Sequence, residues 1–169
     1  MSASASLSPQ REALAAETLR RSGRLRLQVR GESMLPAVWP GDVVEITACS
    51  LIDVRRGEIV LAHREDRFFL HRFIASKQDS FSTRGDSMPA PDLDFPSDAL
   101  LGKLAQVVRA GRTMPAPVPM PLNIWTRAVG IFFCYCRPVR SAALRFQSWR
   151  NSRHLQLSEA KNACEAKNA

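Results

Sequence analysis

The amino-acid sequence predicts a mainly β, barrel-like domain with a short N-terminal helix and a C-terminal amphipathic helical extension. Three observations lead to this prediction. Short segments with strand-like patterns follow one another from about residue 24 to residue 112. Turn residues separate nearly every pair of these segments, as in all-β folds rather than in alternating β-α units. A proline-rich segment then separates this region from a stretch rich in aromatic residues and arginine.

Residues 1–23 are expected to form a disordered segment followed by a short helix. The helix is predicted over residues 10–21, with Leu14 and Leu19 as its apolar contacts and Gly23 at its end. No apolar run precedes the first charged residues, so the sequence predicts neither a signal peptide nor a membrane span. We therefore expect a cytoplasmic protein, with peripheral attachment to a membrane as an option that the C-terminal region raises.

The first strand is predicted over residues 24–31. Leu25, Leu27 and Val29 alternate there with three arginines and one glutamine, a pattern typical of a half-buried strand. A loop broken by two prolines and a glycine follows over residues 32–42. Further strands are predicted over residues 42–48, 57–64, 67–75, 79–85 and 100–111.

The C-terminal third differs in composition from the β region. Residues 113–122 form a proline-rich linker, residues 123–157 a basic amphipathic helical region, and residues 158–169 a polar tail expected to be disordered. The apolar part is shorter than the ~20 residues that span a bilayer. Residues 124–153 contain six arginines and no acidic residue. Such a helix suits an anionic membrane surface, and it could equally pack on the barrel or bind a partner protein.

The chain carries a formal net charge of +8, with a pI near 10.2. This balance suggests an anionic partner or simply favours solubility. No nucleic-acid-binding motif accompanies the charges, so a nucleic-acid partner is not expected. The cysteines and histidines are not spaced as zinc ligands, and the sequence predicts no metal or other cofactor.

Ser33 lies in the loop after the first predicted strand, between Gly31 and two prolines. Taken alone it reads as an ordinary loop serine, but four segments in order resemble signature boxes of the type I signal peptidase family. The first holds Ser-Met-x-Pro, in which serine is the family's nucleophile. The four segments are G-E-S-M-L-P-A-V-W-P-G-D (31–42), R-R-G-E-I-V-L-A (55–62), F-L-H-R-F-I (69–74) and S-T-R-G-D-S (82–87).

The resemblance spans about residues 29–110 and implies a serine endopeptidase that cleaves a protein or peptide substrate. In one branch of the family, the endoplasmic-reticulum and archaeal type, the base is histidine, and His71 occupies that position. Asp86 matches the aspartate of the G-D box, and Asp92 falls where a second acid is expected. We favour Asp92 as the His71 partner and Asp86 as an organiser of the loop, with Asp94 as an alternative partner.

The resemblance also implies that Met34, Leu35 and Pro36, beside the nucleophile, contact the substrate. The Ser-His assignment is chemically reasonable because an imidazole accepts a proton near neutral pH. A carboxylate bonded to its second nitrogen would orient it and stabilise its protonated form.

Two other readings stay open. The self-cleaving repressor peptidases share this barrel and use a serine-lysine pair, for which Lys77 and Lys103 are the lysines in the β region. Lys77 lies in a polar turn, however, and too few residues precede the first strand for a helix-turn-helix. The second reading is a non-catalytic barrel whose basic surface binds a membrane or nucleic acid. The sequence pattern also predicts no N-terminal membrane anchor of the kind that signal peptidases normally carry.

Overall fold

The computed structural model describes residues 9–65 and 67–117. Their secondary structure is one α-helix, eight β-strands and two short 3₁₀ helices. The elements are α1 (Pro9–Ser22), β1 (Arg24–Gln28), β2 (Val43–Ala48), η1 (Leu51–Asp53), β3 (Ile59–Arg64), β4 (Arg67–Ser76), β5 (Ser80–Arg84), β6 (Phe95–Pro96), η2 (Ser97–Ala99), β7 (Leu100–Arg109) and β8 (Arg112–Pro115). The predictions for residues 1–8 and 118–169, including the basic helical region, lie outside the described residues.

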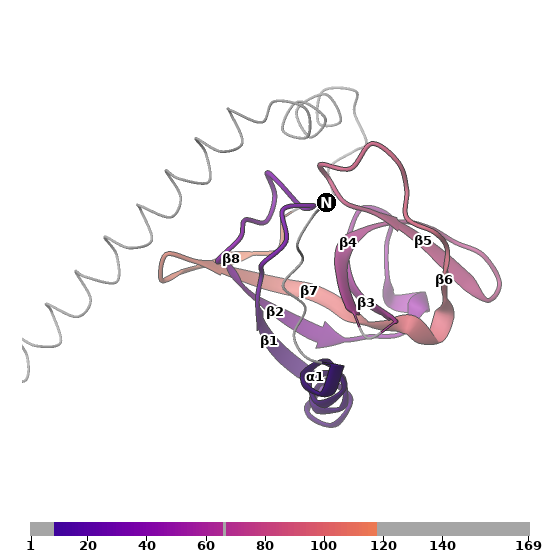
Figure 1. Ribbon diagram of the computed structural model, residues 1–169, viewed down its shortest axis with the longest axis horizontal. Helices are drawn as coiled ribbons and strands as arrows, with labels where there is room; N and C mark the ends of the chain where they lie inside the picture. Colours follow the sequence, from indigo (N-terminus) through magenta and orange to yellow (C-terminus); the bar gives the residue numbers. More distant parts are fainter. Residues whose placement is uncertain (1–8, 66, 118–169) are drawn as a thin grey trace, which may run out of the picture.

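The strands form one antiparallel sheet in the order β1-β2-β7-β3-β4-β5-β6, and β8 also pairs with β7. The sheet curls into a half-barrel, and α1 lies beside β1 at its lower end (Figure 1). The predicted mainly β fold with a short N-terminal helix is therefore confirmed. Each strand that the sequence pattern predicted is present within a few residues of its expected bounds.

The central strand β3 is buried on both faces, and its alternate residues enter two hydrophobic clusters. Ile59 and Leu61 belong to the cluster to which α1, β1, β2 and β7 also contribute residues. Val60 and Ala62 join the second cluster, whose largest members are three phenylalanines. These are Phe73 on β4, Phe81 on β5 and Phe95 on β6. The second cluster thus holds β4, β5 and β6 together.

The helix packs on the domain through a different face from the predicted one. Leu14 is 68% exposed, so its assignment as an apolar contact was wrong, whereas Leu19 is buried as expected. Within residues 12–22 of α1, Glu12 and Ala16 are also buried, and their spacing with Leu19 places them on one side of the helix. Gly23 ends the helix in the left-handed conformation, with its N–H bonded to Leu19 O.

The β domain extends beyond residue 112, into the segment predicted as linker. Residues 112–115 form β8, joined to β7 by a tight turn at Ala110 and Gly111, both with positive φ. Pro115 is tolerated because β8 is a short outer strand and proline sits at its last position. The two-residue β6 was also missed, since so short a strand leaves no alternation in the sequence.

Candidate active site

Ser33, His71 and Asp92 come from three separate segments and form a continuous hydrogen-bonded chain. Ser33 lies in the loop after β1, His71 in β4, and Asp92 in the loop before β6. Ser33 Oγ is 2.8 Å from His71 Nε2, and His71 Nδ1 is 2.6 Å from Asp92 Oδ2. The side chain of His71 is 9% exposed and that of Asp92 17% exposed. The three side chains therefore have the connectivity of a Ser-His-Asp site.

The strand β4 orients His71 by its alternation. Phe69 and Phe73, two residues to either side, pack in the second cluster. The Phe69 and His71 rings pack edge to face, with their centroids 6.0 Å apart. The aromatic packing fixes the side of the sheet on which the imidazole lies, as the sequence pattern had indicated.

Thr83 is a fourth member of the site that the sequence analysis did not single out. It is fully buried on β5, and its Oγ1 donates a hydrogen bond of 2.6 Å to Asp92 Oδ2. In return the Asp92 N–H donates to Thr83 O at 2.8 Å. The signal in the sequence is a hydroxyl two residues from Phe81, at an inward-facing position of an alternating strand.

The ionisation of Asp92 determines which atoms of the hydrogen-bonded side chains carry protons. Burial, the largest influence, would raise the pKa of Asp92. The hydrogen bond and charge of His71 and the Thr83 hydroxyl outweigh it, so the pKa lies below its ordinary value of 3.8. An ionised carboxylate only accepts hydrogen bonds, so His71 Nδ1 carries a proton toward Asp92. In the neutral imidazole Nε2 is then an acceptor, and Ser33 Oγ–H is the donor.

Asp86 does not contact His71 but pairs with Arg72, the next residue on β4. Arg72 Nε and Nη2 bind the two oxygens of Asp86 at 2.7 Å each, and Arg72 Nη1 donates to Gly57 O at 2.6 Å. The Arg72 side chain is only 9% exposed. Asp86 thus ties the loop after β5 to the sheet, and its role as an organiser of the site stays a prediction.

The same loop also holds the segment that carries Ser33. Ser87 N–H donates to Ser33 O at 2.9 Å, and Ser87 Oγ donates to Glu32 O at 3.0 Å. Gly85 lies so close that a Cβ there would be 2.6 Å from Ser33 O. The candidate nucleophile is therefore positioned by backbone contacts from the segment that precedes Asp92.

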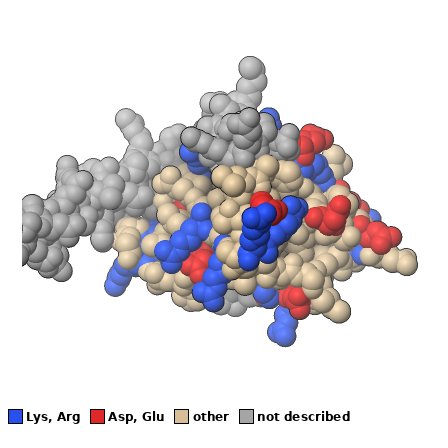
Figure 2. Space-filling view, turned by 90° about the horizontal axis from the view of Figure 1, so that it is seen from below, with Lys and Arg blue, Asp and Glu red and all other residues tan. Residues whose placement is uncertain are grey.

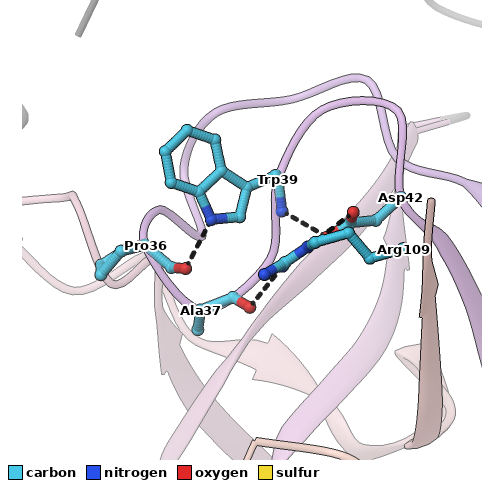
Figure 3. A network of polar contacts seen from close by, with 5 residues as sticks. All are labelled: Pro36, Ala37, Trp39, Asp42 and Arg109. Atoms are coloured by element: carbon cyan, nitrogen blue, oxygen red, sulfur yellow. Dashed lines mark hydrogen bonds and ion pairs between the residues drawn. The ribbon is translucent and has the colours of Figure 1, made fainter. Parts of the chain in front are cut away.

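A second network closes the Ser33 loop at its other end (Figure 3). Arg109, at the end of β7, binds both oxygens of the buried Asp42 and donates to Ala37 O at 3.2 Å. Asp42 in turn accepts the Trp39 N–H at 2.8 Å, and Trp39 Nε1–H donates to Pro36 O at 2.9 Å. The Trp39 ring points away from the Asp42–Arg109 pair. The loop is therefore anchored to the sheet on both sides of Ser33.

Met34 and Leu35 are not placed to contact a substrate, contrary to expectation. Their exposed fractions are 2% and 1%, and Met34 belongs to the main hydrophobic cluster together with Val38. The loop turns these side chains inward because burying them stabilises the fold. Pro36 is exposed and stays a predicted substrate contact.

The other charged candidates contact neither Ser33 nor His71. Asp94 pairs with Lys77 at 2.7 Å on the surface, and this hydrogen bond, followed by the charge of Asp94, raises the pKa of Lys77. Lys103 Nζ donates to Asp53 O at 2.9 Å. A lysine base would need the opposite pKa shift and a contact with the serine.

Neither a metal centre nor a transmembrane helix occurs in the part of the chain described. Residues 9–65 and 67–117 hold no cluster of three or more His, Cys, Asp or Glu side chains able to bind a metal ion. In the same ranges, no helix has both the length and the apolar character of a bilayer span.

On the face that carries α1, the basic side chains of the described residues do not form an uninterrupted positive surface. Figure 2, which views the α1 side, shows Lys and Arg side chains over much of the face, with acidic side chains among and beside them. Arg24 and Arg26 on β1, for example, both pair with Glu45 on β2. The predicted basic face of this strand is thus partly neutralised.

Comparison with known proteins assigns no family. No protein-family model matches the chain, and no curated protein matches it.

Proposed function

We propose that this chain is a signal-peptidase-like serine endopeptidase in which Ser33 is the nucleophile, His71 the general base and Asp92 the acid that orients His71. The single observation that carries the proposal is the unbroken chain from Ser33 Oγ through His71 to Asp92, with links of 2.8 and 2.6 Å. The order of the four sequence boxes supports the same reaction. The substrate is a peptide bond of a protein or peptide.

In the first half of the reaction, Ser33 Oγ attacks the carbonyl carbon while its proton moves to His71 Nε2. The imidazolium that forms is stabilised by the carboxylate of Asp92, which is ionised at neutral pH. The new Oγ–C bond produces a tetrahedral oxyanion, for which we propose the Ser33 backbone N–H as a donor. Collapse of this intermediate breaks the C–N bond, and Nε2 returns the proton to the leaving amine.

In the second half, a water molecule takes the place of the amine. His71 Nε2 accepts a proton from the water as its oxygen attacks the acyl carbon, and the proton then passes to Ser33 Oγ as the ester breaks. The products are a carboxylic acid and the free enzyme. His71 thus needs the same neutral tautomer at the start of both halves, and the bond to Asp92 maintains it.

A fluorophosphonate probe, which phosphonylates activated serines, tests the proposal. Wild-type protein should be labelled at Ser33, and both Ser33→Ala and His71→Ala should lose labelling while remaining folded by circular dichroism. Ser97→Ala, a surface serine on η2, is the matched control and should be labelled normally. Lys77→Ala should also be labelled normally, and its loss of labelling would support the serine-lysine reading instead.

A well-folded wild-type protein that resists the probe would favour the non-catalytic binding module. That alternative has less support, because Arg24 and Arg26 form ion pairs with Glu45, which reduces the net positive charge that this strand offers to a partner. The buried hydrogen-bonded chain would also have no evident purpose in such a module.

A further inference from the structure

The side chain of Met88 lies beside that of Ser33, across the space left by a missing side chain at Gly85. A Cβ built on Gly85 would be 2.8 Å from Met88 Cγ and 3.0 Å from Ser33 Cβ. Both side chains therefore converge on one point next to the candidate nucleophile. Glycine at position 85 is what permits this approach.

Hydrogen bonds hold the loop segment that carries Met88 in place. Its N–H donates to Gly85 O at 3.0 Å, which closes a turn over residues 85–88. Ser87, the residue before it, is buried and binds the carbonyl oxygens of both Ser33 and Glu32. The turn and the nucleophile loop therefore hold Met88 at a defined place relative to Ser33.

Met88 nevertheless keeps 43% of its surface exposed. Among the described residues, three other large apolar side chains are more exposed: Leu14 on α1, Ile52 on η1 and Leu93, which follows Asp92 in the chain. Met88 differs from them because its side chain approaches the same point as that of Ser33. Methionine is unbranched and polarisable, so it adapts to the shape of whatever packs against it. An exposed thioether side chain next to a reactive hydroxyl is suited to contact the substrate.

The chemistry determines which part of the substrate Met88 meets. For attack, the scissile carbonyl carbon must come within about 3–3.5 Å of Ser33 Oγ. The α-carbon and side chain of the residue that supplies this carbonyl are then brought close to Ser33 Cβ, where Met88 lies. We propose that Met88 is a specificity-determining residue, which forms a wall that limits the size of this substrate side chain. The inference rests on the proposed endopeptidase function.

Peptidyl diphenyl phosphonates test the role of Met88. In these probes the carbon attached to phosphorus carries the side chain that, in a substrate, belongs to the residue supplying the scissile carbonyl. Ser33 Oγ attacks phosphorus, an Oγ–P bond forms, and phenoxide leaves and takes up a proton. We would measure second-order inactivation rates with probes bearing the side chain of Ala, Leu or Lys. In Met88→Ala the ratio of the Leu rate to the Ala rate should rise about tenfold or more over wild type, the scale of a pocket that gains several methylene volumes.

A charged variant gives a second, independent readout. Met88→Glu should raise the rate with the Lys probe relative to the Leu probe, because a carboxylate would then face the cation. Ile52→Ala and Ile52→Glu are the matched controls, since Ile52 is 92% exposed on η1. Both controls should keep the wild-type ratios.

The outcomes separate the two proposals. If no probe and no fluorophosphonate labels Ser33 of the folded wild type, the endopeptidase function fails and the role of Met88 fails with it. If wild type is labelled but both Met88 variants keep its ratios, the Met88 proposal is overturned and the Ser33 chemistry stands.

Discussion

Thr83 Oγ1 donates a hydrogen bond of 2.6 Å to the same oxygen of Asp92 that binds His71 Nδ1. Because the Asp92 backbone N–H also donates to Thr83 O, one residue of β5 holds Asp92 through both its carboxylate and its backbone. Thr83 is thus a positioning residue: it acts on the imidazole through Asp92.

Thr83→Val should lower kcat/KM for peptide cleavage about tenfold, since a hydrogen bond to a charged group contributes about 1.5–3 kcal/mol. The hydroxyl also lowers the pKa of Asp92, so its loss should shift the NMR titration of the Asp92 carboxyl to higher pH. Thr83→Ser keeps a hydroxyl and should restore both values. A Val variant with the wild-type kcat/KM would show that the hydroxyl has no part in catalysis.

Gly85→Ala should impair catalysis more than folding. The new methyl group would lie 2.6 Å from Ser33 O and must displace the nucleophile loop. A displacement on the order of 1 Å can reduce the rate about 100-fold, and overpacking costs about 1–3 kcal/mol of stability. Gly31→Ala is the control in the loop that carries Ser33, since a Cβ at position 31 meets nothing within 4 Å. Equal activity of the two variants, assayed as initial peptide-cleavage rates, would contradict the role given to Gly85.

The ionised Asp92 makes stability depend on pH in a defined direction. Its pKa in the folded protein lies below the ordinary value of 3.8, so its contribution is complete above that pH. As pH falls below 3.8 toward the folded-state pKa, the unfolded chain takes up the proton first and the contribution is lost. Urea unfolding from pH 6 to pH 2.5 should show a wild-type minus Asp92→Asn difference that declines in this window. A difference independent of pH would refute the assignment.

Arg72→Met should destabilise the domain by about 3–5 kcal/mol, because it leaves the carboxylate of Asp86 without its partner in a largely buried site. Adding Asp86→Leu should recover part of this loss, because the uncompensated charge is removed. Chemical denaturation of the two single variants and the double variant measures the coupling. Additive losses would show that the pair does not act as a unit.

The predicted basic helical region can be tested directly, although residues 123–153 lie outside the described part of the chain. Its six arginines and its aromatic residues suit an anionic bilayer. Protein comprising residues 1–169 should sediment with phosphatidylserine-containing vesicles, and release should follow as salt is raised. A chain ending at residue 121 should sediment less. Equal sedimentation of the two proteins would exclude this region as the membrane anchor.

Local patterns in the sequence were sufficient for the strands and for the face on which His71 lies. The alternation of Phe69, His71 and Phe73 is a property of the backbone in any strand, so it does not depend on the rest of the fold. The choice of Ser33 rested on resemblance to a family motif, because a serine between prolines is otherwise an ordinary loop residue. The resemblance led to the wrong expectation for Met34 and Leu35, whose apolar side chains are buried instead.

Only the tertiary structure decided which residues meet. Ser33 and His71 are 38 positions apart and His71 and Asp92 are 21 apart, so their contacts depend on how the loops close over the sheet. That closure brings Asp92 to His71 while Asp94, two residues further on, pairs with Lys77 at the surface. The sequence by itself determined the strands and their inward faces through local periodicity. The fold decided the acid, its Thr83 partner and the approach of Met88 to Ser33, because these depend on register and on contacts between distant segments.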